Sequence, residues 1–184
     1  MPLQSYLDMY DPAEIPKPRE ADWNRRGFPL QSLADKADRY SPREIAAARR
    51  AFYAQCTLID HQIRLVIGTL REEGLLDETL ILFTADHGDM LFDHGLTAKR
   101  VMYENAARVP LILSGELLAE RAGAVDGRIA GLQDVMPTLL DACGIPIPAN
   151  VEGESLIAEP RREYLYGEIS EGDLATRMIR KVTV

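Results

Sequence analysis

Apolar residues in the first half of the chain recur with the spacing of an α-helix. They follow one another mostly at steps of three and four residues, at Phe52, Cys56, Ile59, Ile63, Val66, Ile67 and Leu70. Ser41 to Glu44 reads Ser-Pro-Arg-Glu, a capping box with proline at the first helical position, and Gly74 marks an end. This pattern predicts one long helix whose apolar face is broad enough to pack on a sheet.

Shorter apolar runs predict strands. Residues 79–84 are nearly continuous in apolar character, as in a strand covered on both faces, and they complete half of a βαβ unit with the preceding helix. Residues 109–113 form a similar run, and residues 163–169 and 175–184 predict two further strands. Between residues 113 and 163, Asp134 is expected to cap a helix that runs to Ala142 and ends at Gly144. The pattern indicates an α/β fold.

Residues 1–40 predict neither a long helix nor a free linker. Prolines recur too often for the first, whereas Tyr6, Tyr10, Trp23 and Phe28 are too apolar for the second. We expect an ordered segment that covers another part of the protein.

Composition narrows the classes of function. Twenty-one basic and twenty-nine acidic residues leave a net charge of −8, which argues against a general nucleic-acid surface. No apolar run approaches the roughly 20 residues that span a bilayer, and the N-terminus lacks the pattern of a secretory signal. Neither observation separates cytoplasm from periplasm. Cys56 and Cys143 lack metal-site spacing, and we predict that both are core residues.

The most informative chemistry follows the first apolar strand, where Asp86-His87-Gly88 occurs. Adjacent side chains point to opposite faces of a strand, so both can reach one ion only if the backbone turns, and Gly88 would permit this. A carboxylate with an imidazole suits Ca, Mg, Mn or Zn, with the first three favoured by oxygen-rich surroundings. Two ligands are too few for a complete site. The alternative is that Asp86 caps the next turn and His87 bonds the backbone.

A second Asp-His-Gly spans residues 93–95, with Lys99 shortly after it. Lysine is a compact cation suited to a tetrahedral oxyanion, although most lysines are only solvated. His94 could donate a proton, bind the anion or tie the loop to the backbone. We expect Gly88 and Gly95 to leave this loop flexible.

The passage TADHGDMLFDHGLTAKRVMYENAARVPLILSG resembles the sulfatases, in which two Asp-His-Gly motifs and a lysine precede a Tyr-Glu and an Arg-Val-Pro-Leu-Ile strand. The similarity covers roughly residues 2–180. It implies part of an alkaline phosphatase-like sandwich, a mixed and mostly parallel sheet flanked by helices. It also implies that Asp86 and His87 bind a divalent metal ion, with calcium favoured over magnesium or manganese, that Lys99 contacts the sulfate or phosphate group, and that His94 lies near the ester.

The same resemblance shows what this sequence lacks. The family's N-terminal aspartates and its Cys-x-Pro-x-Arg or Ser-x-Pro-x-Arg motif, the source of the formylglycine nucleophile, have no counterpart here. We therefore expect an incomplete chain: a covering segment at 1–40, the C-terminal part of the catalytic domain at 41–160 and the start of a β subdomain at 161–184.

The expected function is hydrolysis of a small-molecule sulfate ester, with little activity in this chain alone. The alternatives are a phosphonate or phosphate ester hydrolase of the same superfamily and a non-catalytic metal-binding remnant. Substrate and oligomeric state stay open.

Overall fold

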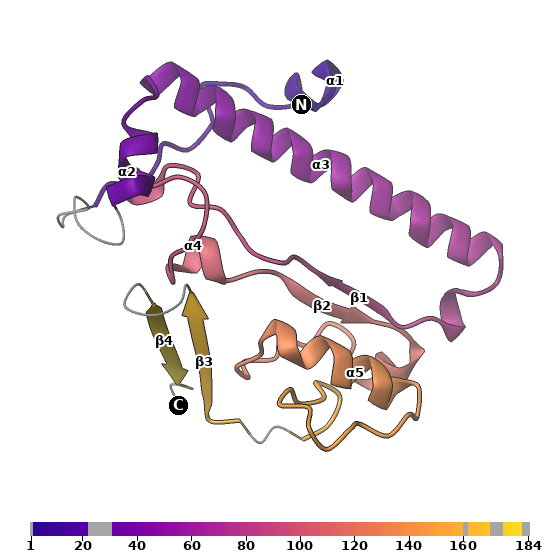
Figure 1. Ribbon diagram of the computed structural model, residues 1–184. Coiled ribbons are helices and arrows are strands. Elements are labelled where there is room, and N and C mark those ends of the chain that lie inside the picture. Colours follow the sequence, from indigo (N-terminus) through magenta and orange to yellow (C-terminus); the bar gives the residue numbers. More distant parts are fainter. Residues whose placement is uncertain (1, 22–30, 160–161, 170–174, 182–184) are drawn as a thin grey trace. The chain divides into compact units, whose positions relative to one another are not determined.

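The computed structural model describes residues 2–21, 31–159, 162–169 and 175–181 (Figure 1). The chain divides into two compact units. Unit 1 comprises Met1–Asp77 and His87–Val109, and unit 2 comprises Glu78–Asp86 and Pro110–Val184. The chain therefore crosses between the units three times. The sequence predicted three consecutive segments, 1–40, 41–160 and 161–184. The two units are defined by contacts within the structure, so they do not test that prediction.

Unit 1 is built on the long helix α3, Pro42–Glu72 (Figure 1). Its capping box is complete: the Ser41 hydroxyl accepts from the Glu44 N–H, and the Glu44 carboxylate accepts from the Ser41 N–H at 2.8 Å. The helix ends before Gly74, which adopts a left-handed φ of +69° that glycine allows without steric cost. The predicted helix and both of its boundary signals are confirmed.

The start of the N-terminal segment lies on α3, and the covering role of residues 1–40 as a whole stays a prediction. The start includes helix α1, Gln4–Leu7, which contacts α3. The Tyr6 hydroxyl and His61 Nδ1 are 3.2 Å apart, and the Tyr10 hydroxyl is hydrogen-bonded to Thr57. A second short helix, α2, follows at Gln31–Ala37. Trp23 and Phe28, which helped to predict this covering role, lie outside the described residues.

The apolar face predicted for α3 is largely exposed. Its packing on a sheet stays a prediction. Phe52, Ile59 and Val66 are 37%, 52% and 61% exposed, and Cys56 is exposed as well. The helix instead buries Arg49 and Ala54. Periodicity identifies which side chains share an apolar face, but it carries no information about how much of that face is buried.

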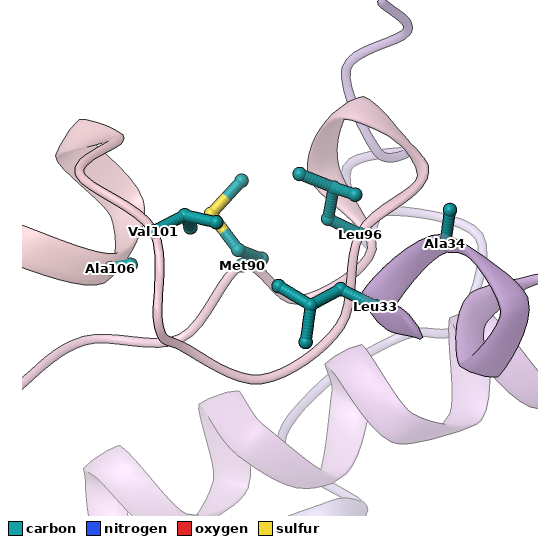
Figure 2. Packing of buried hydrophobic residues seen from close by; sticks show 6 residues of the cluster. All are labelled: Leu33, Ala34, Met90, Leu96, Val101 and Ala106. Carbon is teal, nitrogen blue, oxygen red and sulfur yellow. The ribbon is translucent and has the colours of Figure 1, made fainter. Parts of the chain in front are cut away.

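The core of unit 1 joins α2 to the loop that follows the first Asp-His-Gly. Figure 2 shows Leu33 and Ala34 on α2 and Met90, Leu96, Val101 and Ala106 on the loop and on α4, Glu104–Ala107. Met90 and Leu96 are fully buried. The loop also contains a one-turn 3₁₀ helix, Asp93–Gly95. This loop is therefore a packed element and not the flexible connection that its glycines predicted.

The described residues of unit 2 form two antiparallel strand pairs. Strand β1, Ile81–Thr84, pairs with β2, Leu111–Ser114, in the register Ile81 to Ser114. Strand β3, Tyr164–Ile169, pairs with β4, Thr176–Lys181. The predicted strands are confirmed where they are described, but β1 is only half-buried. In the described residues both pairings are antiparallel, so they supply only the antiparallel part of the mixed sheet that was expected.

Helix α5, Val135–Ala142, confirms the predicted helix and its Gly144 end, where φ is +67°. Asp134 stands at the N-cap position, but its side chain does not cap α5 as predicted. Its carboxylate accepts hydrogen bonds from the Gly131 and Glu154 N–H groups and from Arg162 instead. A guanidinium is the stronger partner for a buried carboxylate, because it also neutralises the charge.

Four 3₁₀ segments complete the described elements: Leu76–Glu78, Glu116–Arg121 and Leu132–Asp134, with the Asp93–Gly95 turn already named. Among the described helices, none combines the length and apolar character needed to cross a bilayer.

Both cysteines are exposed, so their predicted core position is wrong. Cys56 lies on the uncovered side of α3, and Cys143 lies at the C-terminal end of α5. Free cysteine is usually buried, but burial requires a packing partner, which neither helix position has in this structure.

Candidate functional site

His87 and Lys99, two of the predicted site residues, are in contact in unit 1. His87 is half-buried, and its Nδ1 lies 2.8 Å from the Gly88 carbonyl oxygen. A carbonyl only accepts hydrogen bonds, so Nδ1 donates and the lone pair of the neutral ring lies on Nε2. The Lys99 ammonium donates to that Nε2. The structure therefore places a cation beside an imidazole lone pair.

Gly88 holds His87 against α4 by close backbone approach. The Gly88 N–H donates to the Ala106 carbonyl at 2.9 Å, and a Cβ at position 88 would lie 2.0 Å from the Asn105 carbonyl oxygen. Gly88 is not among the glycines with a left-handed φ. The glycine of this motif is therefore required for space and not for the bend that the sequence suggested.

Lys99 reaches His87 from a loop with an unusual backbone. Five non-glycine residues between 91 and 100 have positive φ: Leu91, Phe92, His94, Ala98 and Arg100. Such values are uncommon outside glycine, and they persist only where the surrounding structure determines them. Lys99 itself is exposed at the end of this loop, with its ammonium directed to His87.

Asp93, the acid of the second Asp-His-Gly, is buried and accepts hydrogen bonds from three residues. The sequence did not predict this role. Its Oδ1 lies 3.0 Å from Arg49 Nη1, and its Oδ2 accepts from Asn105 Nδ2 at 2.9 Å. The Arg19 N–H also donates to Oδ1, at 3.1 Å. The repetition of Asp-His-Gly could have drawn attention to this acid, but nothing in the sequence pairs it with Arg49.

His94 is tied to the same loop. Its backbone N–H donates to the Arg19 carbonyl at 2.6 Å, and its ring lies 5.6 Å from the Tyr103 ring. The hydrogen bond is made by the backbone, so the alternative in which the His94 side chain ties the loop to the backbone also stays a prediction. A role near the ester stays a prediction.

Asp86 is exposed and lies two residues after Thr84, the last residue of β1. It is the last residue of the first segment of unit 2, whereas His87 opens the second segment of unit 1. The expected metal ligands are thus consecutive residues at the boundary of the two units.

The donor chemistry of His87 fits a metal ligand. Histidines that bind metals commonly donate their second ring N–H to a carbonyl, which is the arrangement of Nδ1 with Gly88. The ligand count does not reach a full site: within the described ranges, no group of three or more His, Cys, Asp or Glu side chains is arranged to hold an ion. Two ligands alone cannot complete a divalent cation site.

Comparison with known proteins supports the resemblance noted in the sequence. The model of the family described as Sulfatase matches residues 8–145. An arylsulfatase of Clostridium perfringens is 38% identical over 186 residues, which cover 94% of this chain and 38% of that protein. The chain therefore spans well under half of the length of this relative.

Solved structures agree on the fold. A phosphonate monoester hydrolase from Silicibacter pomeroyi matches with a TM-score of 0.77 at 28% identity, covering 96% of this chain and 42% of the other. One from Agrobacterium radiobacter matches with a TM-score of 0.83 at 24% identity, covering 96% and 43%.

The expected α/β fold of the alkaline phosphatase-like superfamily is confirmed by these matches, although only part of it is present. A structural match covering most of the chain and a family model covering residues 8–145 lead to one conclusion. The chain belongs to the sulfatase family.

Proposed function

We propose that this chain contributes part of the active site of a metal-dependent sulfuric ester hydrolase. The contact between Lys99 and His87 Nε2 carries the proposal, because it joins a cation to a predicted metal ligand at a sulfatase motif. The match to an arylsulfatase at 38% identity favours a sulfate ester as the substrate.

Lys99 would bind the sulfate group. Its ammonium is exposed, so an ester can reach it without rearrangement of the core. A tetrahedral sulfate gains negative charge on its nonbridging oxygens during hydrolysis, and a fixed cation stabilises that charge more in the transition state than in the ground state.

Asp86 and His87 would supply two of the ligands of a divalent cation. Calcium is favoured over magnesium or manganese because it accepts more oxygen ligands and a flexible geometry. When bound, such an ion neutralises charge on the oxygens of the ester. His87 would offer Nε2, and the Lys99 ammonium that now donates to this nitrogen would turn to the sulfate, because one lone pair serves a single partner.

The isolated chain is expected to hydrolyse esters negligibly. The described residues lack a full ligand set, and the chain covers 38% of the length of the arylsulfatase it matches. In this proposal residues 1–40 cover α3, residues 41–160 carry the site, and residues 161–184 begin a further β subdomain.

A phosphonate or phosphate ester is the second candidate substrate. The phosphonate monoester hydrolase from Silicibacter pomeroyi is 28% identical over 96% of this chain. Sulfate and phosphonate monoesters both present tetrahedral anionic oxygens, so the ammonium of Lys99 suits either.

A chimera tests both candidates. The part of the Clostridium perfringens arylsulfatase that matches this chain is replaced by the chain itself, and the product is assayed with para-nitrophenyl sulfate and with para-nitrophenyl phenylphosphonate. Higher kcat/KM for the sulfate supports the proposal, and preference for the phosphonate supports the second candidate. A folded chimera that hydrolyses neither ester contradicts the proposed function.

A further inference from the structure

A single arginine joins three parts of unit 1. Arg49 lies on α3, and its Nε donates to the Pro16 carbonyl at 2.8 Å. Its Nη1 donates to the Leu91 carbonyl at 2.6 Å and to Asp93 Oδ1 at 3.0 Å. The side chains of Arg49 and Asp93 are 8% and 7% exposed. This buried ion pair therefore fixes the loop against α3 and the N-terminal segment.

The carboxylate of Asp93 extends the connection to His87. Its Oδ2 accepts from the side-chain amide of Asn105. The backbone carbonyl of Asn105 lies against Gly88. The residue after Asn105 accepts the Gly88 N–H. Asp93 is thus linked through Asn105 to the residue that directly follows His87, and through the loop to Lys99.

The backbone of the loop needs such support. Phe92 and His94, which flank Asp93, have φ values of 69° and 56°, and Ala98 beside Lys99 has a φ of 60°. A side chain disfavours this region, so the conformation persists only when contacts around it exclude the alternatives. The hydrogen bonds to Leu91 and Asp93 act on this part of the loop.

We propose that Asp93 is a positioning residue of the proposed site: with Arg49 and Asn105, it holds the loop so that the Lys99 ammonium meets His87 Nε2. Asp93 acts through the loop and does not itself contact the ester. The inference rests on the proposed function only for what the His87 and Lys99 pair does.

Nuclear magnetic resonance on the 184-residue chain tests the proposal through the substitution Asp93→Asn. An amide keeps the shape of the carboxylate but is neutral, and it cannot accept at both of its polar atoms. We expect loss of the NOE between the Lys99 Hε protons and the His87 ring, together with altered ³J(HN,Hα) couplings at Phe92 and His94. An unchanged NOE with unchanged couplings would overturn the proposal.

The matched control is Asp126→Asn, the same change at another arginine-paired aspartate. Asp126 accepts from Arg128 at 2.7 Å and Arg121 at 2.9 Å, and all three residues belong to unit 2. The NOE and the loop couplings should stay as in the wild type. Their loss in this control would show that they report general destabilisation, which would count against positioning by Asp93.

A second variant covers the case in which Asp93→Asn does not fold. Asn105→Ala removes one neutral hydrogen bond to Asp93 and leaves the Arg49 ion pair in place. We expect at least a twofold weaker NOE between Lys99 and His87. Full retention of the NOE in folded Asn105→Ala then refutes the proposed route from Asp93 to His87.

Titration with sodium sulfate separates this inference from the proposed function. If the wild-type Lys99 signals do not respond to sulfate but the NOE depends on Asp93, positioning holds and the proposed anion contact fails. If sulfate binds Asp93→Asn as tightly as the wild type, with the NOE intact, the anion contact holds and positioning fails.

Discussion

The ammonium of Lys99 donates a hydrogen bond to Nε2 of His87, twelve residues earlier in the chain. Both residues belong to unit 1, and the loop between them is packed through Met90 and Leu96, which are fully buried. The backbone that carries Lys99 is therefore part of a folded element, although the lysine side chain itself is exposed.

Replacing Lys99 by methionine keeps much of its length and removes its charge. In the arylsulfatase chimera we expect kcat for para-nitrophenyl sulfate to fall by about 10²–10³-fold, as for other residues that stabilise a developing oxyanion. The control is Lys36→Met at another exposed lysine of unit 1. Equal activity of the Lys99 variant and the parent chimera would contradict the assigned role.

Gly88→Ala should disrupt the approach of the first Asp-His-Gly to α4. The added Cβ would lie 2.0 Å from a backbone oxygen, Asn105 O, and a backbone atom cannot rotate away as a side chain can. We expect a lower melting temperature and a large amide shift at Ala106, which accepts the N–H of residue 88. Gly127→Ala is the control, because no atom lies within 4 Å of its added Cβ. A Gly88→Ala variant with a wild-type spectrum would show that the close approach is absent in solution.

Metal removal should leave the isolated chain unchanged. Since no group of three candidate ligands occurs within the described ranges, any ion at Asp86 and His87 is expected to bind weakly. Scanning fluorimetry with a chelator, and with millimolar CaCl₂, should give the same melting temperature. A saturable rise with calcium would mean that the chain holds a tighter site, since a ligand at 100 times its Kd stabilises by about 2.7 kcal/mol.

The lowered pKa of Asp134 predicts that unit 2 becomes less stable in acid. Burial raises the pKa of its carboxyl, but the hydrogen bonds from Arg162, Gly131 and Glu154 outweigh burial and hold the pKa below its usual value of 3.8. A carboxyl with a lowered folded-state pKa stabilises above the unfolded value, and the stabilisation is lost as pH falls through the folded value. We expect the free energy of unfolding to decrease below about pH 4, measured by urea denaturation.

The variant Asp134→Asn checks the source of that pH dependence. It should lose about 3–5 kcal/mol at neutral pH, because Arg162 would keep its charge without a carboxylate partner. Its stability should then fall less steeply in acid than that of the wild type. Parallel acid profiles for the two proteins would assign the effect to other carboxyl groups.

Both thiols should react in the folded chain, because Cys56 and Cys143 are exposed. Burial of part of the thiol raises the pKa of Cys56 above its ordinary value of 9.0, so the reactive thiolate is scarce at neutral pH. Titration with Ellman's reagent should modify two thiols without denaturant, and the Cys56 rate should rise with pH beyond 9.0. The reaction of Cys56 is identified by its absence in the variant Cys56→Ser. A thiol that reacts only in denaturant would restore the core position predicted from the sequence.

Local signals in the sequence were sufficient for most elements. The Ser41 to Glu44 capping box, the end at Gly74 and the strand pair of residues 164–181 involve partners that lie close in the chain, so neighbouring residues determine them. The Asp-His-Gly motif and the downstream lysine also stood out as candidates, because their side-chain chemistry and their place after a strand can be read directly.

Only the tertiary structure decided which of these groups meet. Arg49 and Asp93 are 44 residues apart, and their ion pair depends on how α3 and the loop pack. The reason for Gly88 likewise lies in the distant backbone of Asn105. For the same reason, the exposure of the apolar face of α3 could not be predicted from the sequence. A spacing of three and four residues encodes which side chains share a face, whereas burial, ion pairing and close approach depend on segments that the chain brings together only on folding.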